Sequence, residues 1–119
     1  MRITVAICTR NRSSQLQHTL TQMRKLAIPP DVQWELLVVN NSSTDATDSV
    51  LTAFAHCLPL RRLFEPTPGK SHALNLAVRE ASGDYILWTD DDVLVDPDWI
   101  NGYHEAFLRW PEAAVRIEP

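Results

Sequence analysis

Residues 85–92 read YILWTDDD, an apolar, strand-like run that ends directly in three carboxylates. The same change occurs twice more, because ITVAIC (3–8) runs into TRNR (9–12) and WELLVV (34–39) runs into NNSS (40–43). Short, nearly continuous apolar runs are typical of strands buried on both faces of a parallel sheet. Ligands of such sheets bind at the carboxyl ends of the strands, so the three polar stretches predict one shared site.

Segments with helical spacing of apolar residues separate these runs. A helix is predicted to begin at a capping box of Ser14 and Gln17, to carry Leu16, Leu20, Met23 and Ala27, and to end at Pro29-Pro30. Next along the chain, the sequence predicts a helix carrying Val50, Leu51, Phe54 and Leu58, and then a weaker strand over 60–64. A helix over 71–81 follows, with Ala73, Leu74, Ala77 and Val78 inward. A last helix is predicted to have Asp96 as N-cap, Pro97 at its first position and Ile100, Tyr103 and Phe107 on its apolar face, and a strand is predicted over 114–117. Strand–helix units in series predict an α/β fold of three layers, α/β/α, with a mostly parallel, Rossmann-like sheet.

Length and composition fit one folded unit over residues 1–119, since 45% of the residues are apolar and 22% are charged. No apolar run approaches the roughly 20 residues that span a bilayer, so no membrane segment is predicted. The two cysteines, Cys8 and Cys57, are too few for a disulfide scaffold. We therefore expect a cytoplasmic protein, either free or at the inner face of the membrane.

Charge is distributed unevenly along the chain. Residues 80–108 hold eight acids and no Lys or Arg, whereas the remainder holds seven acids and eleven bases, so −8 and +4 give the net charge of −4. A mildly acidic chain without a basic stripe is a poor partner for nucleic acid, and none is expected. A concentrated acidic segment instead predicts a bound cation.

The adjacent carboxylates Asp90-Asp91-Asp92 would raise one another's pKa unless a cation or basic groups neutralise them, and no base lies near in sequence. Carboxylate oxygens suit Mg²⁺ or Mn²⁺, which often share their coordination with phosphates. As alternate residues of an extended segment, Asp90 and Asp92 are predicted to face one metal. The alternative is a solvated acidic turn that caps the next helix, although Asp96 is expected to fill that cap.

The other polar stretches each have a functional and a structural interpretation. Thr9-Arg10-Asn11-Arg12 offers hydroxyl, amide and guanidinium groups beside a helix start, which suits phosphate; it is otherwise a solvated loop. Asn40-Asn41-Ser42-Ser43-Thr44-Asp45 either bonds a base or ribose edge or forms a turn and helix cap. Lys70, at a helix start, is placed to meet a diphosphate, and Asn75, one turn on, to line the same cleft.

Together these stretches resemble an inverting nucleotide-sugar glycosyltransferase of family 2, which has the GT-A fold. The resemblance rests on four ordered matches: residues 5–12, residues 38–45, residues 69–75 with 81–87, and residues 90–92 with Pro97-Asp98. They run through nearly the whole chain, and their order and spacing make the resemblance specific. It implies that residues 1–119 are the N-terminal, nucleotide-sugar-binding part of a GT-A domain, truncated after the metal motif.

The family resemblance also implies roles for single residues and a divalent metal, Mn²⁺ or Mg²⁺. Thr9 and the loop after it (Arg10, Asn11, Arg12) would contact the base and ribose of a nucleoside-diphosphate sugar, and Asn40, followed by Asn41, stands where many members have Asp against the base. Lys70 would approach the diphosphate, and Asn75 would line the donor cleft. Asp91 would lie near the ribose, and Asp92 with Asp90 would hold the metal. In this family the base that deprotonates the acceptor hydroxyl lies downstream of the metal motif. The base and the site for the acceptor, whether glycan, lipid or protein, are therefore expected beyond Pro119, and this part alone is expected to be inactive.

Two other functions fit parts of the sequence. A phosphoacceptor signalling domain is also small, doubly wound and Mg²⁺-binding, but it needs an acidic pair after the first strand, where Cys8-Thr9-Arg10 stands. A non-catalytic nucleotide-binding or assembly module stays open as the alternative. Such a module is expected to associate with itself through the surface that the missing half would cover.

Overall fold

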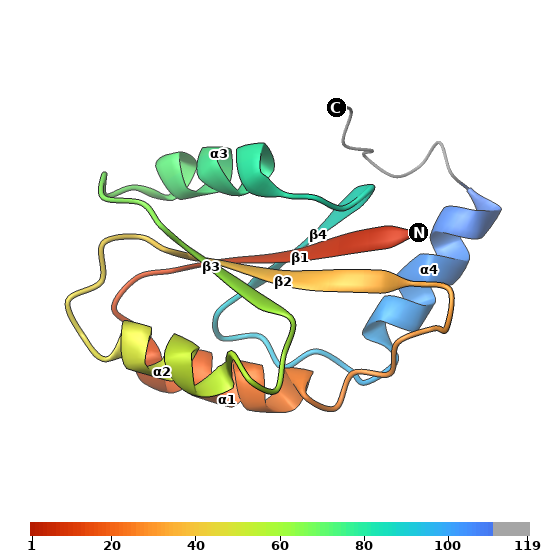
Figure 1. Ribbon diagram of the computed structural model, residues 1–119, viewed down its shortest axis with the longest axis horizontal. Helices are drawn as coiled ribbons and strands as arrows, with labels where there is room; N and C mark the ends of the chain where they lie inside the picture. Colours follow the sequence, from red (N-terminus) through yellow and green to blue (C-terminus); the bar gives the residue numbers. More distant parts are fainter. Residues whose placement is uncertain (111–119) are drawn as a thin grey trace.

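Strands and helices alternate along the chain in the predicted order. The computed structural model describes residues 1–110, so the strand predicted over 114–117 lies outside the described residues. The elements are β1 (Arg2–Thr9), α1 (Ser13–Met23), β2 (Gln33–Asn40), α2 (Thr47–Phe54), β3 (Leu60–Phe64), α3 (Lys70–Glu80), β4 (Tyr85–Asp90) and α4 (Trp99–Arg109) (Figure 1). No helix within residues 1–110 combines the length and the apolar character needed to cross a membrane.

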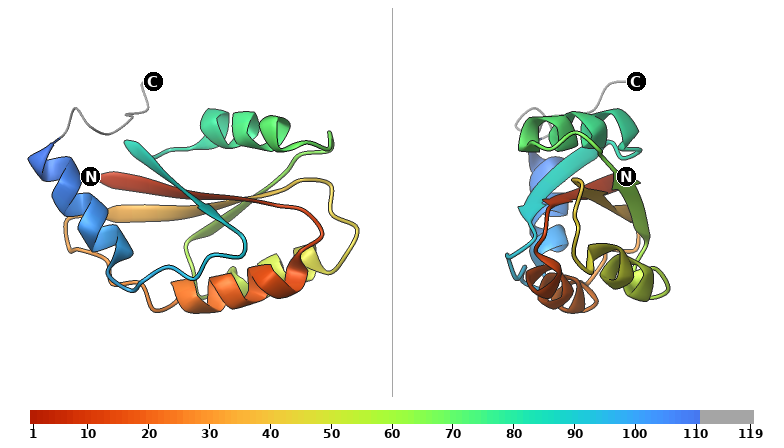
Figure 2. Two further views of the ribbon diagram at one scale, coloured as in Figure 1. Left: turned by 180° about the vertical axis from the view of Figure 1, so that it is seen from behind. Right: turned by 90° about the vertical axis from the view of Figure 1, so that its left-hand side faces the viewer.

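The four strands form one parallel sheet in the order β3-β2-β1-β4. The chain moves outward from β1 to β3 and then returns to place β4 on the other side of β1. Because parallel crossovers are right-handed, this reversal puts α3 on the opposite face of the sheet from α1 and α2 (Figure 2). The predicted three-layer α/β/α fold is confirmed, and the reversal marks the place where such sheets bind ligands.

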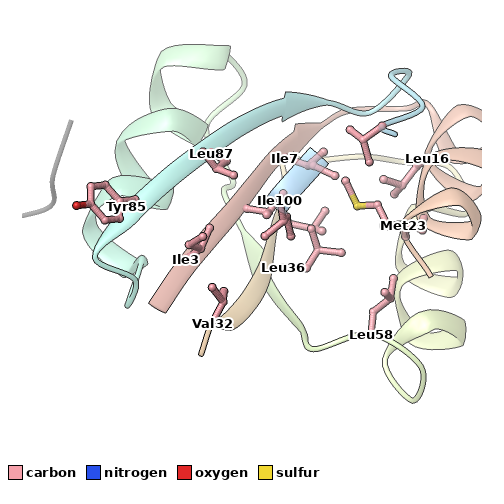
Figure 3. Packing of buried hydrophobic residues seen from close by; sticks show 14 of the residues in the cluster. Ile3, Ile7, Leu16, Met23, Val32, Leu36, Leu58, Tyr85, Leu87 and Ile100 are labelled. Atoms are coloured by element: carbon pink, nitrogen blue, oxygen red, sulfur yellow. The ribbon is translucent and has the colours of Figure 1, made fainter. Parts of the chain in front are cut away.

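Alternate residues of the strands fill two separate apolar layers. Ile3 and Ile7 of β1 lie on the sheet face that α1 and α2 cover (Figure 3). With Val5, Leu36 and Ile100 they belong to the larger cluster. The smaller cluster, under α3, consists of Ala6, Leu37, Val39, Ala73 and Ala77. Burial on both faces explains why the central strands read as continuous apolar runs, and it fixes their polar carboxyl ends in place.

Helix α4 lies across the end of the sheet where the strands begin (Figure 1). Phe107 of α4 stacks on Tyr85, the first residue of β4, with ring centroids 4.1 Å apart. The predicted inward position of Tyr103 is wrong, because this side chain is 43% exposed while His104 is buried. His104 is accommodated there because its Nε2 lies 3.1 Å from Oδ2 of Asp31.

Two predicted helix starts are wrong. Helix α1 begins at Ser13, and no capping box forms, because the Ser13 N–H donates to Oδ2 of Asp45 in the neighbouring loop at 3.1 Å. Helix α4 begins at Trp99 with Asp98 as its N-cap. Asp96 instead accepts a 2.8 Å hydrogen bond from the N–H of Asp98 and closes a turn before the helix.

Three predicted helical patterns extend too far. Helix α2 ends at Phe54, so Leu58 lies beyond it. Helix α1 ends at Met23, and Ala27 leaves it to donate its N–H to the carbonyl of Pro97 at 2.9 Å. On α3, Val78 is 49% exposed, because the small side chains of Ala73 and Ala77 bring the helix close to the sheet along a narrow stripe.

Candidate functional site

The polar stretches after the strands meet in one cleft at the carboxyl ends of β1 and β4, beside the reversal of strand order. The cleft has a volume of about 460 Å³. Its walls are Cys8, Thr9, Arg10, Arg12, Asn41, Gly69, Lys70, Ala73, Asp90, Asp91 and Asp92. Parallel strands end at the same edge of the sheet, which is why residues from four distant segments share this space.

Asp91 is the buried anchor of the acidic turn and is only 5% exposed. Its Oδ2 accepts a 2.8 Å hydrogen bond from the hydroxyl of Thr9, and its Oδ1 lies 3.5 Å from Nε of Arg12. Its backbone carbonyl accepts a further bond of 2.7 Å from the hydroxyl of Thr19 on α1. A buried carboxylate needs such partners, and here they fix the turn against β1 and α1.

Asp90 and Asp92, on either side of this anchor, expose their carboxylates to the cleft. Oδ2 of Asp92 lies 2.9 Å from Nη2 of Arg12, and Oδ1 of Asp90 lies 3.9 Å from Nζ of Lys70. The predicted extended segment is wrong, since β4 ends at Asp90 and the N–H of Val93 returns to the carbonyl of Asp90. The bases that were absent from the neighbouring sequence are supplied by other segments through the fold.

The chemistry of these side chains fits a divalent metal that arrives with phosphates. Asp90 and Asp92 offer hard oxygen donors at an open cleft, while the carboxylate of Asp91 already accepts a hydrogen bond from Thr9. Among the described residues, no three His, Cys, Asp or Glu side chains form a group that could hold a metal by themselves. Mg²⁺ is commonly held by one or two carboxylates with substrate phosphates and water, which matches two exposed carboxylates rather than an enclosed protein site.

Asn41 braces the cleft wall with its whole amide group. Its Nδ2 donates to the carbonyls of Glu65 and Thr67 at 3.2 and 2.8 Å, and its Oδ1 accepts the N–H of Gly69 at 3.0 Å. Gly69 has a backbone φ of +134°, which residues other than glycine rarely adopt. The pair therefore sets the path by which the chain enters α3 and presents Lys70, the first residue of that helix, to the cleft.

Three predicted donor contacts lie outside the cleft walls. Asn40 is buried and donates to Oδ1 of Asp48 at 3.1 Å, and Asn75 is exposed on α3. Asn11 joins two loops, because its Oδ1 accepts the N–H of Thr44 at 2.7 Å. Direct donor contacts by these three residues stay predictions, whereas Thr9, Arg10, Arg12, Asn41, Lys70 and the three aspartates are brought together.

Sequence reasoning missed two contributors to the site. Thr19 holds the acidic turn, and its signal was a hydroxyl among the inward apolar residues of α1, next to Leu20. Cys8 lines the cleft; burial raises the pKa of its thiol, Lys70 lowers it, and Asp90 with Asp91 raises it further. The net shift is upward, so Cys8 is a neutral wall of the cleft at pH 7.

Comparison with known proteins gives a consistent result. The sequence model of the family described as glycosyl transferase family 2 matches residues 4–115. Poly-beta-1,6-N-acetyl-D-glucosamine synthase of Staphylococcus epidermidis is 29% identical over 89 residues, which are 74% of this chain and 21% of the relative.

Solved structures superimpose on most of the chain. The mannosyltransferase PcManGT from Pyrobaculum calidifontis, in complex with GDP-Man and Mn²⁺, has a TM-score of 0.80 and 32% identity over 89% of this chain and 32% of its own. S. aureus TarS 1–349 in complex with UDP-GlcNAc has a TM-score of 0.80 at 24% identity, over 92% of this chain and 32% of its own. At this identity the likeness is evidence for the GT-A fold only.

The chain spans only a part of these relatives, from 21% of the synthase to 32% of the two solved structures. The family model, in contrast, covers nearly the whole of the chain, and the parallel sheet with helices on both faces is that of the GT-A neighbours. This chain belongs to glycosyl transferase family 2.

Proposed function

We propose that the cleft is the donor site of a metal-dependent glycosyltransferase that moves a sugar from a nucleoside-diphosphate sugar to an acceptor hydroxyl. The observation that carries the proposal is the placement of Asp90 and Asp92 opposite Arg12 and Lys70 in one open cleft. A metal–diphosphate ligand presents both signs of charge, and this cleft complements both. The GDP-Man and Mn²⁺ in the PcManGT complex support this assignment.

Each wall of the cleft has a proposed task. Asp90 and Asp92 hold the metal, which when bound neutralises the charge that develops on the leaving diphosphate. Lys70 and the backbone N–H groups of the first turn of α3 bind the diphosphate oxygens. The nucleoside lies over the loop of residues 9–12 and Asn41, with its ribose toward Asp91.

The remaining steps of transfer need groups that we place outside this chain. The chain spans 21% to 32% of the compared relatives, so the acceptor site and the catalytic base are proposed to lie in the length that it does not span. We expect the chain by itself to bind the donor and metal without completing transfer. We propose that the acceptor class, whether glycan, lipid or protein, is set by the length of the relatives that this chain does not span.

Calorimetric titration with UDP, GDP and UMP, each with Mn²⁺ and with EDTA, tests the proposal. We expect a diphosphate to bind at least about tenfold more tightly with Mn²⁺ than with EDTA, and UMP to show no such gain, because it lacks the bridging phosphate. Equal binding in EDTA would contradict the metal dependence. Failure of any nucleoside diphosphate to bind would contradict the donor site itself.

One observation favours the second candidate, a non-catalytic nucleotide-binding or assembly module. In residues 1–110, β4 is one of the two edge strands, with β3 at the opposite edge, and its far edge is unpaired. Trp88 of β4 and Leu94 shortly after it are 44% and 63% exposed. A second copy of the chain is the proposed partner of this edge. Light scattering should then show dimers at micromolar concentration, and a monomer at all concentrations would contradict this candidate.

A further inference from the structure

A single guanidinium joins the buried and the exposed carboxylate of the acidic turn. Nη2 of Arg12 lies 2.9 Å from Oδ2 of Asp92, while Nε of the same side chain lies 3.5 Å from Oδ1 of Asp91. Lys70 lies farther from its carboxylate, at 3.9 Å from Asp90, and both of those side chains are well exposed. Arg12 is therefore the cation that is closest to the proposed metal ligands among the described residues.

The contact to Asp92 conflicts with the presence of a metal at that carboxylate. A divalent cation at Oδ2 would stand within a few ångströms of the positive charge of the guanidinium, and the two repel strongly at that separation. The contact to Asp91 does not conflict in the same way, because that carboxylate is buried and bonded to Thr9. Arg12 can therefore leave its ion pair with Asp92 while its ion pair with Asp91 remains.

The backbone position of Arg12 limits how far it can withdraw. It is the N-cap residue of α1, and its carbonyl accepts the N–H of Leu16 at 2.9 Å. Its side chain is 44% exposed, so the guanidinium is free to turn within the cleft that it lines. An anionic oxygen in the cleft would offer this guanidinium a replacement for Asp92.

We propose that Arg12 is a placeholder for the metal: it holds Asp92 in the metal-free protein and transfers to a phosphate oxygen when metal and nucleoside diphosphate bind together. This inference rests on the proposed metal site at Asp90 and Asp92. Metal alone then binds weakly, because it must displace Arg12 without offering it a new partner. Metal and nucleotide consequently strengthen each other's binding, and the coupling is reciprocal.

Mn²⁺ binding to wild type and to Arg12→Gln, measured by the electron paramagnetic resonance of free Mn²⁺, tests this inference. Without nucleotide, Arg12→Gln should bind Mn²⁺ about two- to fivefold more tightly, the scale of one lost ion pair at a partly exposed site. With GDP or UDP present, the variant should lose most of the extra Mn²⁺ affinity that the nucleotide gives to wild type.

Arg24→Gln is the matched control, because it removes one exposed guanidinium at the C-terminal end of α1, and Arg24 does not line the cleft. It should change the affinity for Mn²⁺ alone by less than about twofold, because solvent screens an exposed charge that is not in the cleft. Arg12→Lys, which keeps the charge, should bind Mn²⁺ alone no more than about twofold more tightly than wild type. Thermal melts verify that each variant is folded.

The outcomes separate this inference from the proposed function. Equal or weaker binding of Mn²⁺ alone by Arg12→Gln, while nucleotide still strengthens Mn²⁺ binding to wild type, would overturn the placeholder and leave the metal site intact. Absence of Mn²⁺ binding by every variant, with and without nucleotide, would overturn the metal site and the placeholder with it.

Discussion

The hydroxyl of Thr9 donates a 2.8 Å hydrogen bond to the carboxylate of Asp91, across 82 positions of sequence. Thr9 is the last residue of β1, and Asp91 is the first residue after β4. Both are buried, so this bond ties the two strands together beside the reversal of strand order. The acidic turn therefore has its position before any ligand is present, and Asp90 and Asp92 are the carboxylates of the turn that stay well exposed in the cleft.

Replacement of Thr9 by Val should destabilise the chain by about 1–3 kcal/mol, because the change keeps the shape and leaves a buried carboxylate short of one donor. Urea unfolding at pH 7 measures the loss. Thr9→Ser, which keeps the hydroxyl, should recover a large part of it. A Thr9→Val protein as stable as wild type would show that the bond does not anchor the turn.

Glu35 predicts a specific loss of stability in acid. Burial alone would raise its pKa, but hydrogen bonds from Thr4 and from the N–H and hydroxyl of Ser82, together with the charge of Arg2, outweigh it and lower the pKa. A folded pKa below the unfolded one contributes stability at high pH, and this contribution is lost as the pH falls from about 5 through the folded pKa.

Urea unfolding between pH 7 and pH 3 should therefore show a smaller acid-induced loss of stability in Glu35→Gln than in wild type. Glu105→Gln is the control, because Glu105 is an exposed carboxylate of α4. It should follow the wild-type pH profile. Parallel profiles for wild type and Glu35→Gln would contradict the assignment.

Gly83 permits a close approach of two chain segments. A Cβ at this position would lie 2.6 Å from the backbone nitrogen of Thr4, so the backbone must shift to accept it. Gly83→Ala should cost about 1–3 kcal/mol in the free energy of unfolding. Gly102→Ala is the control, since a Cβ there meets no atom within 4 Å and alanine favours the interior of α4. It should leave stability unchanged or raise it by up to about 1 kcal/mol.

The amide of Asn40 predicts an unfavourable effect of an acidic residue at this position. Its Nδ2 donates to Oδ1 of Asp48 at 3.1 Å, so Asn40→Asp would place two carboxylates together. We expect a loss of about 1–3 kcal/mol at pH 7 from the lost donor and the repulsion. Asp48→Asn in the same chain should restore most of the stability, and denaturation curves that show no recovery would contradict this explanation.

The order of the elements and the shared edge of the sheet could be predicted from the sequence, because buried parallel strands produce apolar runs that stop sharply at polar residues. The ion pairs Arg12–Asp92 and Lys70–Asp90 could not. They depend on β4 pairing with β1 rather than with β3, which is decided by packing of whole elements. Local spacing carries no information on that choice.

The predicted helix starts are wrong for a related reason. The capping box of Ser14 and Gln17 is a local pattern, but the acceptor that the Ser13 N–H finds is Asp45, which lies 32 positions later. Bonds with Thr47, the largest influence, and with Ser13 lower the pKa of Asp45, so this acceptor stays ionised at neutral pH. Tertiary partners of this kind outweigh local capping preferences and become visible only in the folded chain.

The most direct test compares Asp92→Asn with Asp98→Asn in calorimetric titrations of GDP and UDP with Mn²⁺. Both changes remove one negative charge from the acidic segment of residues 80–108, but only Asp92 lines the cleft. We predict that Asp92→Asn weakens Mn²⁺-dependent nucleotide binding about tenfold or more, and that Asp98→Asn leaves it within about twofold of wild type. Equal binding by the two variants would contradict the assignment of Asp92 as a metal ligand and, with it, the metal-dependent donor site.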